Sequence, residues 1–410
     1  MENEMVILPG SKSRAARLLI LDYIRGERSV RGGLPECDDT QFLAKAMQDL
    51  CRQPSGGNFY LGSGAASLRF FVALVASLEG FEGEIEVSPQ LARRPLAPLV
   101  DALRSVGAEI NYLRNEGYPP LFIKGKKLRG GKVSVNGAVS SQFISAIMMA
   151  SQLWMAPAMI EIAGKQVSTP YIELTRRMIE ACGSCELEAD WSAAAFFYEA
   201  ALLTPGREIR IANLTPPEKS LQGDAGVAGL FHLLGVESDW QENGDVVIKG
   251  NKDIIEKMRR LPDPLELDLG SMPDSVPALA VGMAMAGIRY RFINIGHLRH
   301  KESNRLDVLK TELEKIGIAA DTTQDSLMWS GGRMPMAENE VIECSDDHRI
   351  AMAFAPAAAK LDYISIRDPE CVDKSFPDYF DQLEKICYIM TGSPFASIRY
   401  EGKNILNNDH

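Results

Sequence analysis

A recurring helix–glycine–strand pattern constrains the fold of this chain more than any other feature of its sequence. Amphipathic helix patterns end at a glycine four times, with apolar strand patterns between the helices: residues 94–106 before Gly107, 171–182 before Gly183, 224–234 before Gly235 and 305–316 before Gly317. Glycine suits the left-handed residue that closes a helix. Helices that alternate with short strands predict an α/β protein, of the α+β type, built of repeated units. Because the glycines are irregularly spaced, an open solenoid is not expected.

Length and composition indicate two domains. The chain has 410 residues, of which 46 % are hydrophobic, and this is more apolar material than a single core usually holds. A boundary is predicted near Cys185–Asp190, where a helix pattern ends and a short acidic link leads into a second apolar helix over residues 191–203. The two parts on either side of this link are about equal in length.

Charge, hydropathy and cysteine usage narrow the class of protein. The net charge is −11, whereas general nucleic-acid binders are normally basic. No apolar run approaches the roughly 20 residues that a membrane helix needs, and the acidic start is not typical of a signal peptide. Seven scattered cysteines are typical of reduced thiols in the cytoplasm. Cys182 and Cys185 form a CxxC motif without a second ligand pair, so a metal is not expected there; a redox pair and two ordinary thiols both remain open.

Cationic and hydroxyl side chains gather where predicted helices begin. A turn at Pro9-Gly10 leads into a helix, so free backbone N–H groups can bind an anion beside Lys12, Ser13 and Arg17. An ordinary helix cap with a surface lysine is the alternative, and the glycine order of a P-loop is missing. Further segments could likewise bind a ligand, or could simply cap a helix, pack closely or carry solvated charge. They contain Ala65, Arg94, Ser140, Ser141, Gln142, Ser168 and Tyr171.

The second half of the chain adds further candidates. Asp274 lies in a turn, and a capping role is its simplest interpretation. Lys301 and Arg305 are one helical turn apart, with Glu302 beside them as a candidate proton carrier tuned by cations. A salt-bridged surface helix is the alternative for that segment. Neither the segment with Arg349 nor the one with Lys374 is decisive alone.

Taken together, these segments indicate a site for polyanionic small molecules. If the helix starts converge on one cleft, they bring seven cations to it: Lys12, Arg17, Arg94, Lys301, Arg305, Arg349 and Lys374. The sequence has no Walker motif, dinucleotide fingerprint or cluster with metal-ligand spacing. We therefore expect no metal and no nucleotide cofactor.

The order of these motifs resembles that of the 5-enolpyruvylshikimate-3-phosphate (EPSP) synthase family, the 3-phosphoshikimate 1-carboxyvinyltransferases. The matching segments span residues 6–380: Pro9–Ser13 with Arg17, Asp38–Thr40, Leu61-Gly62 with Arg69, Arg94-Pro95, Tyr118–Leu121, Ser140–Phe143, Ser168 with Pro170-Tyr171, Gln222–Asp224, Pro273-Asp274, Lys301-Glu302 with Arg305, Asp347–Arg349, and Lys374 with Phe376-Pro377. The resemblance implies two domains of three similar α/β units each, with inner helices and outer sheets, and a cleft between the domains that closes. By position the domains would be residues 12–187, and residues 1–11 with 188–410.

The resemblance also implies a reaction and residue roles. The enolpyruvyl group of phosphoenolpyruvate would move to the 5-hydroxyl of shikimate 3-phosphate through a tetrahedral intermediate, with release of phosphate. Asp274 would take the hydroxyl proton, and Glu302, Lys12 or both would protonate the methylene carbon. Shikimate 3-phosphate would be bound by Ser13, Arg17, Ser140, Ser141, Gln142, Ser168, Tyr171, His297 and Lys301, and phosphoenolpyruvate by Lys12, Ala65, Arg94, Gln142, Arg305, Arg349 and Lys374. A monomer without nucleic-acid or membrane partners is expected.

Four departures from the family pattern keep alternatives open. Ala65 falls where the family often has glycine, so its methyl group is expected to weaken inhibition by glyphosate, a longer analogue of phosphoenolpyruvate. His297 and Thr169 replace a common asparagine and a common lysine. Only residues 184–186 stand where the family carries a longer segment, which keeps open a catalytically inactive relative that binds an anionic metabolite. The related UDP-N-acetylglucosamine enolpyruvyl transferases favour Lys-Asn where this chain has Lys12-Ser13.

Overall fold

The chain folds into two compact units. The computed structural model describes residues 5–136, 141–163, 169–181, 186–336, 340–361, 363–391 and 398–401. The N-terminal unit comprises residues 10–188 and 221–223, and the C-terminal unit comprises residues 1–9, 189–220 and 224–410. Four residues of interest lie outside the described residues: Ser140, Ser168, Cys182 and Cys185.

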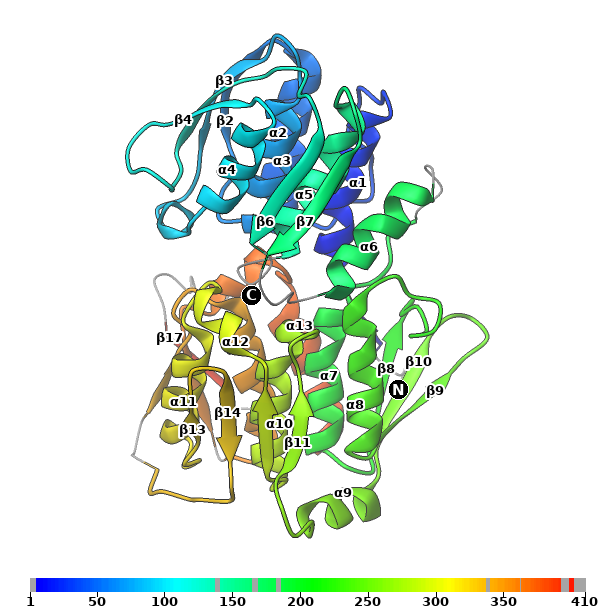
Figure 1. Cartoon of the computed structure of the whole chain (residues 1–410). Coiled ribbons are helices and arrows are strands. Elements are labelled where there is room, and N and C mark those ends of the chain that lie inside the picture. The colour runs from blue at the N-terminus through cyan, green and yellow to red at the C-terminus, as the bar shows by residue number, and fades with distance from the viewer. Residues whose placement is uncertain are drawn as a thin grey trace. The chain divides into compact units, whose positions relative to one another are not determined.

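One strand topology recurs in three four-stranded sheets. In each sheet a parallel pair of strands lies at one edge and an antiparallel hairpin at the other (Figure 1). The N-terminal unit holds one, in the order β2 (Gly56–Tyr60), β3 (Glu82–Glu86), β5 (Leu121–Lys124), β4 (Glu109–Tyr112). The C-terminal unit holds two, in the orders β1 (Val6–Ile7), β8 (Glu208–Ala212), β10 (Val246–Gly250), β9 (Val236–Trp240), and β11 (Leu265–Asp268), β12 (Tyr290–Ile293), β14 (Ser326–Trp329), β13 (Asp321–Thr322). This recurrence confirms the prediction of an α/β protein built of repeated units.

Each unit also holds one smaller sheet. In the N-terminal unit it is the parallel pair β6 (Gly131–Asn136) and β7 (Ala158–Ala163). In the C-terminal unit three parallel strands form it: β15 (Val341–Glu343), β16 (Ile364–Arg367) and β17 (Ile398–Glu401). In the complete repeats, the second helix is followed by a hairpin. The corresponding helix here is α6 (Thr169–Glu180). After it, the described chain resumes at residue 186 and enters no strand before α7. The short segment noted in the sequence therefore falls where a complete repeat would carry its hairpin.

Helices form the core of the N-terminal unit. The central one, α3 (Ala65–Ala76), is apolar apart from Ser67 and Arg69, and 11 of its 12 residues are buried. A helix that is hydrophobic all round belongs inside a core rather than on its surface. It packs on α5 (Ser141–Ala150), and the other helices of the unit are α1 (Lys12–Ile24), α2 (Asp38–Arg52), α4 (Ala97–Ser105) and α6. Short 3-10 turns cover Leu91–Arg93 and Ser151–Leu153.

The C-terminal unit repeats this design around α7 (Trp191–Leu203), in which all 13 residues are buried. The apolar helix α10 (Val276–Ala286) packs on α7 and on α12 (His348–Phe354). The remaining helices are α8 (Val227–Leu233), α9 (Lys252–Arg259), α11 (Arg305–Lys315) and α13 (Tyr379–Thr391). Five 3-10 turns complete it: η3 (Gly223–Gly226), η4 (Pro273–Ser275), η5 (Gly296–His300), η6 (Ala355–Ala359) and η7 (Pro369–Lys374).

The helix-ending glycines behave as the sequence predicts where the structure describes them. Gly107, Gly235 and Gly317 have φ angles of 109°, 99° and 79°. These positive values lie in the region that only glycine adopts without strain. Gly183 is outside the described residues.

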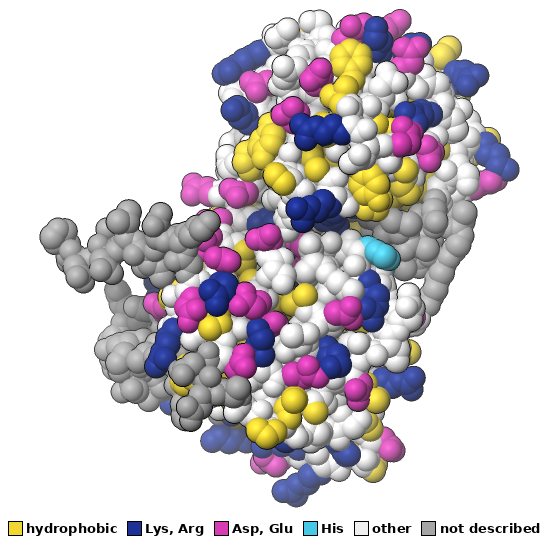
Figure 2. Space-filling view, turned by 90° about the vertical axis from the view of Figure 1, so that its left-hand side faces the viewer, with side chains coloured by type: hydrophobic (Ala, Val, Ile, Leu, Met, Phe, Trp, Pro, Cys, Tyr) yellow, Lys and Arg dark blue, Asp and Glu magenta, His cyan; other side chains and the backbone are white. Residues whose placement is uncertain are grey.

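Acidic and basic side chains are interspersed on the face shown in Figure 2, with only small apolar patches between them. The net charge of −11 is therefore not gathered into one acidic field on that face. None of the described helices is long and apolar enough to cross a membrane.

Candidate active site

Asp274 is the centre of a cationic cluster in the C-terminal unit. It lies in η4, directly before α10, and its Oδ1 is 3.1 Å from Arg305 Nη1 and 3.4 Å from Lys301 Nζ. Its Oδ2 is 3.1 Å from Arg349 Nη2, and Arg349 Nη1 donates to the Asp274 carbonyl at 3.3 Å. Three cations thus converge on one carboxylate, which leaves positive charge to balance an anion.

Asp347 fixes two of these cations in place. Its carboxylate accepts from Arg305 Nε at 2.9 Å and from Arg305 Nη2 at 3.1 Å, and both side chains are almost fully buried. Asp347 also caps α12 by accepting the Arg349 N–H at 3.1 Å. Burial alone would lower the pKa of Arg305, but Asp347 and Asp274 outweigh burial and hold it above its usual value. Burial alone would raise the pKa of Asp347, and Arg305 holds it below its usual value. Both groups therefore stay charged.

Glu302 is held between an imidazole and an ammonium group. Its Oε2 is 2.8 Å from His348 Nδ1, and its Oε1 is 3.2 Å from Lys374 Nζ. His348 has 1 % of its side chain exposed, against 13 % for Glu302. A carboxyl group with partners on both oxygens and limited exposure can hold a proton at a fixed place and give it up there.

Ligand atoms of Glu302, Asp347 and His348 lie close enough together to suggest a metal site. The carboxylate oxygens already have partners, however, because Arg305 takes both oxygens of Asp347 while His348 and Lys374 take those of Glu302. A divalent cation would also have to sit beside a guanidinium and an ammonium group. The three residues fit an ion-pair network better than a metal centre, and we assign no metal to them.

His297 completes the cluster as a neutral group. Burial, with help from Lys301 and Arg305, lowers the pKa of His297 to about 4, although Asp274 and Asp325 oppose the shift. Its Nε2 is buried and has no hydrogen-bond partner among the described residues. A neutral imidazole can donate to or accept from a hydroxyl group, which suits the ligand-binding role expected of it.

In the N-terminal unit, Arg17 ties α1 to α6. It donates to the Ser13 carbonyl at 2.7 Å, to Thr175 Oγ1 at 2.7 Å and to the Tyr171 carbonyl at 3.2 Å. Burial lowers the pKa of Arg17 to about 10, and Tyr171 opposes this shift. Because neutral oxygens take most of its donors, Arg17 serves in this structure to position Ser13 and Tyr171.

A pair of neighbouring arginines lies elsewhere in the N-terminal unit, with Arg69 in the first half of α3 and Arg94 shortly before α4. Arg69 is buried, donates from Nη1 to Gln142 Oε1, and lies over the Phe143 ring at 4.5 Å. Burial and the neighbouring Arg94 hold the pKa of Arg69 well below its usual value. Two guanidinium groups that repel each other in a buried place are best stabilised by a bound anion. The sequence-based site included Arg94 and Gln142 but not Arg69.

The predicted residues therefore form separate groups within the two units. One group surrounds Asp274 and contains His297, Lys301, Glu302, Arg305, Arg349 and Lys374. In the other unit, Lys12 Nζ is 3.0 Å from Asp39 Oδ2, and Arg17 joins Ser13 to Tyr171. Ala65 and Ser141 are the first residues of α3 and α5, and both are buried.

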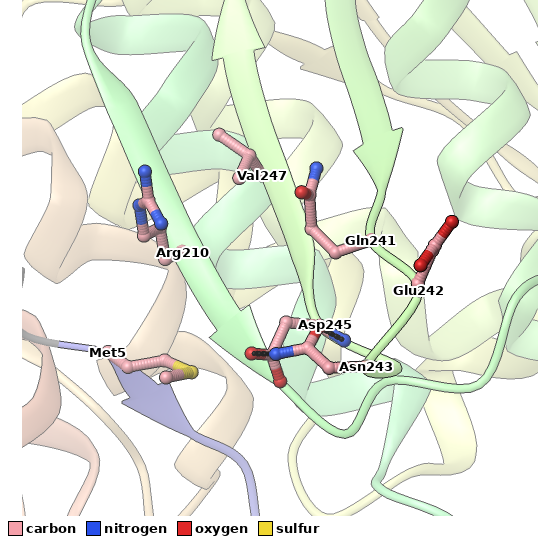
Figure 3. Close-up of a pocket in the computed structure, with 7 residues that line it drawn as sticks. All are labelled: Met5, Arg210, Gln241, Glu242, Asn243, Asp245 and Val247. Atoms are coloured by element: carbon pink, nitrogen blue, oxygen red, sulfur yellow. Dashed lines mark hydrogen bonds between the residues drawn. The ribbon is translucent and has the colours of Figure 1, made fainter.

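The surface hollow of Figure 3 does not suit the expected ligands. It has a volume of about 400 Å³ and lies beside the β1–β8–β10–β9 sheet. Arg210 is the one cation in its lining, which otherwise consists of Met5, Gln241, Glu242, Asn243, Asp245 and Val247. Asn243 donates to Asp245 at 2.6 Å, so these two polar groups satisfy each other.

Known proteins resemble this chain over most of its length. The family model described as EPSP synthase (3-phosphoshikimate 1-carboxyvinyltransferase) matches residues 52–186 and 182–383. A 3-phosphoshikimate 1-carboxyvinyltransferase of Bacteroides fragilis is 35 % identical over 402 residues, which cover 92 % of this chain and 94 % of that protein. One of Photobacterium profundum is 30 % identical, over 94 % of this chain and 96 % of that protein. The chain belongs to the EPSP synthase family.

Solved structures match the fold of this EPSP synthase family member across most of its length. EPSP synthase of Acinetobacter baumannii matches with a TM-score of 0.68 and 21 % identity, over 94 % of this chain and 96 % of that one. An enolpyruvyl transferase of Streptomyces tendae matches with a TM-score of 0.63 and 14 % identity, over 94 % of both chains. At these identities the matches support the enolpyruvyl transferase fold alone.

Proposed function

We propose that this EPSP synthase family member transfers the enolpyruvyl group of phosphoenolpyruvate to the 5-hydroxyl of shikimate 3-phosphate and releases phosphate. The names of its relatives support this activity, which belongs to aromatic amino acid biosynthesis. The observation that carries the proposal is the single carboxylate of Asp274 held by Lys301, Arg305 and Arg349. This arrangement offers one proton acceptor surrounded by binding groups for a substrate with several negative charges.

Asp274 takes the proton of the attacking hydroxyl in this mechanism. The hydroxyl oxygen bonds to the central carbon of phosphoenolpyruvate while its proton passes to the carboxylate. Protonation removes the negative charge that Lys301, Arg305 and Arg349 balance, so their positive charge becomes available to the phosphate and carboxylate of the tetrahedral intermediate. Cations placed in advance around developing charge stabilise a transition state without reorganising at the moment of reaction.

Glu302 is the proton donor to the methylene carbon. The carbon becomes a methyl group in the intermediate, and it returns a proton when the carbon–oxygen bond to phosphate breaks. His348 and Lys374 hold Glu302 in one position, as its contacts at 2.8 and 3.2 Å indicate. Lys12 is the second candidate for this step, and its partner Asp39 keeps it oriented at 3.0 Å.

The N-terminal unit supplies further ligand contacts in this proposal. Arg94 and Gln142 bind phosphoenolpyruvate, and Arg69 adds to them by fixing the amide of Gln142 through its Oε1. Ser13, Ser141 and Tyr171 bind shikimate 3-phosphate, with Arg17 as the group that positions them. Ala65, at the start of α3, limits the length of the donor that fits.

Phosphate release from the purified chain tests the proposal. With shikimate 3-phosphate and phosphoenolpyruvate both present, we expect phosphate release that stops when either is left out and that Asp274→Asn slows by about 10²- to 10⁴-fold. Asp321→Asn is the control, because Asp321 is an exposed aspartate in β13 outside the cluster. Binding of both ligands by calorimetry without release would instead identify an inactive relative. Gel filtration of the same sample tests whether the protein is a monomer, as expected. We propose that the protein is located in the cytoplasm.

A further inference from the structure

Two buried hydroxyl groups lie against the Arg17 guanidinium in the N-terminal unit. Arg17 Nε donates to Thr175 Oγ1 at 2.7 Å, and Arg17 Nη2 donates to Ser145 Oγ at 3.3 Å. The two hydroxyl oxygens are 2.8 Å apart, and both side chains have 0 % of their surface exposed. They also lie 2.9 Å and 3.4 Å from the Tyr171 carbonyl oxygen. These groups form one hydrogen-bonded set, the hydroxyl network, which joins α1, α5 and α6.

The number of protons fixes the direction of these bonds. A hydroxyl group donates one hydrogen bond and can accept two. Thr175 accepts from Arg17 and donates to Ser145. Ser145 accepts from both of them, so its own proton goes to the Tyr171 carbonyl. Every hydroxyl proton in the network then has an acceptor, and the network ends on the first turn of α6.

The hydroxyl network takes the place of a counter-ion for Arg17. The arginine is 2 % exposed and forms no ion pair with a carboxylate among the described residues. Burial lowers the pKa of Arg17 only to about 10, so the guanidinium is charged at neutral pH. A buried charge must have hydrogen-bond partners, and losing one of them costs more than losing a bond between neutral groups.

Helix α6 depends on this network because no hairpin strand packs on it in the described part of the chain. In the complete repeats the second helix packs on its own hairpin, as α8 does on β9 and α11 does on β13 and β14. Helix α6 packs on α5 and α1, and Arg17 links it to the Ser13 carbonyl as well. The hydroxyl network thus holds together the two segments that carry Ser13 and Tyr171.

We propose that Thr175 and Ser145 are positioning residues, which set the affinity for shikimate 3-phosphate by holding Arg17 against Ser13 and Tyr171. The inference rests on the proposed function, because that function assigns Ser13 and Tyr171 to this substrate. Neither hydroxyl touches the substrate itself, since both are fully buried. They act through the guanidinium, which fixes the first turns of α1 and α6 relative to each other.

The other binding and catalytic groups have separate supports. In the N-terminal unit Arg69 Nη1 donates to Gln142, which is assigned to phosphoenolpyruvate. The catalytic carboxylates Asp274 and Glu302 belong to the other unit. Loss of the hydroxyl network should therefore raise the KM for shikimate 3-phosphate more than the KM for phosphoenolpyruvate, and it should change kcat less than either.

Two substitutions at one position separate the hydroxyl group from the shape of its side chain. Thr175→Val keeps the shape and removes the hydroxyl, whereas Thr175→Ser keeps the hydroxyl and removes a methyl group. We expect Thr175→Val to raise the KM for shikimate 3-phosphate by about 10-fold, because a charged donor loses its acceptor. Thr175→Ser should recover most of this affinity. Ser145→Ala should also raise that KM, and by less in the Thr175→Val background, because both residues act on one guanidinium.

Ser77→Ala is the matched control, because Ser77 is a buried hydroxyl of the same unit outside the network. Ser77 donates to the Ala73 carbonyl at 2.8 Å and accepts from Trp154 Nε1 at 2.8 Å. This variant should lose stability and leave both KM values unchanged. Thermal melting shows which variants are folded at the assay temperature, and Ser145→Ala carries the test if Thr175→Val is not folded.

Two results would overturn the inference: equal KM values for Thr175→Val and Thr175→Ser, or an equal rise in the KM of both substrates with Thr175→Val. Failure of the proposed function looks different, because the wild type then releases no phosphate. Calorimetry with shikimate 3-phosphate decides that case. A wild type that binds it, with affinity about 10-fold weaker in Thr175→Val, upholds the positioning role, while a wild type that does not bind it refutes function and inference together.

Discussion

Glu199 makes the stability of the C-terminal unit depend on pH in an unusual direction. It lies in α7 with 0 % of its surface exposed, against Gly282 of α10, and neither carboxylate oxygen has a hydrogen-bond partner among the described residues. Burial holds the pKa of Glu199 well above its usual 4.5. The folded state therefore keeps the Glu199 proton to a higher pH than the unfolded chain does.

The sign and size of the effect follow from proton linkage. Above pH 4.5 the folded state binds one proton more than the unfolded state, so stability falls as pH rises. The slope is about 1.4 kcal/mol per pH unit until the folded acid itself ionises, which amounts to about 3 kcal/mol between pH 5 and pH 7. Glu199→Gln removes the titration and keeps the shape. We therefore expect the free energy of unfolding of Glu199→Gln, relative to that of the wild type, to be about 3 kcal/mol larger at pH 7 than at pH 5.

Urea unfolding at pH 5 and pH 7, followed by tryptophan fluorescence, measures this difference. In a Trp154→Phe background the remaining tryptophans, Trp191, Trp240 and Trp329, all lie in the C-terminal unit. The exposed Glu242 provides the control variant Glu242→Gln, which should follow the wild type at both pH values. An equal stability difference between Glu199→Gln and the wild type at the two pH values would refute the reasoning.

Three further predictions concern the proposed reaction. Asp274→Asn should lower kcat by about 10²- to 10⁴-fold because it removes the proton acceptor; phosphate release measures it, and unchanged kcat would remove Asp274 from the mechanism. Ala65→Gly should tighten glyphosate inhibition by about 10-fold or more because one methyl group leaves the donor site; an unchanged inhibition constant would contradict this. Arg69→Lys should raise the KM for phosphoenolpyruvate more than it changes the KM for shikimate 3-phosphate, because a lysine cannot hold Gln142 and share the buried anion site as a guanidinium does; equal changes in both KM values would argue for a purely structural role.

The fold class could be predicted from local sequence patterns because its helices and turns are determined by residues close in sequence. The helix-closing glycines and the apolar helix α7 depend on residues close in sequence, so glycine placement and a continuous apolar run predict them. The pairing of the repeats into sheets follows from the same alternation of helices and strands.

The contacts that shape the candidate site could not be predicted in the same way. Arg305 and Asp347 are 42 residues apart, and only the packing of α11 against the turn before α12 brings them together. Arg69 is buried within an apolar helix, and two signals could have added it to the site: a lone arginine in such a helix, and its place in the matched motif Leu61-Gly62 with Arg69.

The repeated architecture explains why one cluster holds so many functional groups. Asp274 precedes α10, Arg305 begins α11 and Arg349 lies in the first turn of α12, so three successive helices of the repeats start at the same carboxylate. The N-terminus of a helix carries partial positive charge and free N–H groups, which adds to the charge of the side chains placed there. Asp347 uses this property by capping α12 while it holds Arg305. A repeat that brings its helix starts together thus gathers cationic side chains around one carboxylate, and in the proposed mechanism Asp274 balances their charge until it takes up the proton of the substrate hydroxyl.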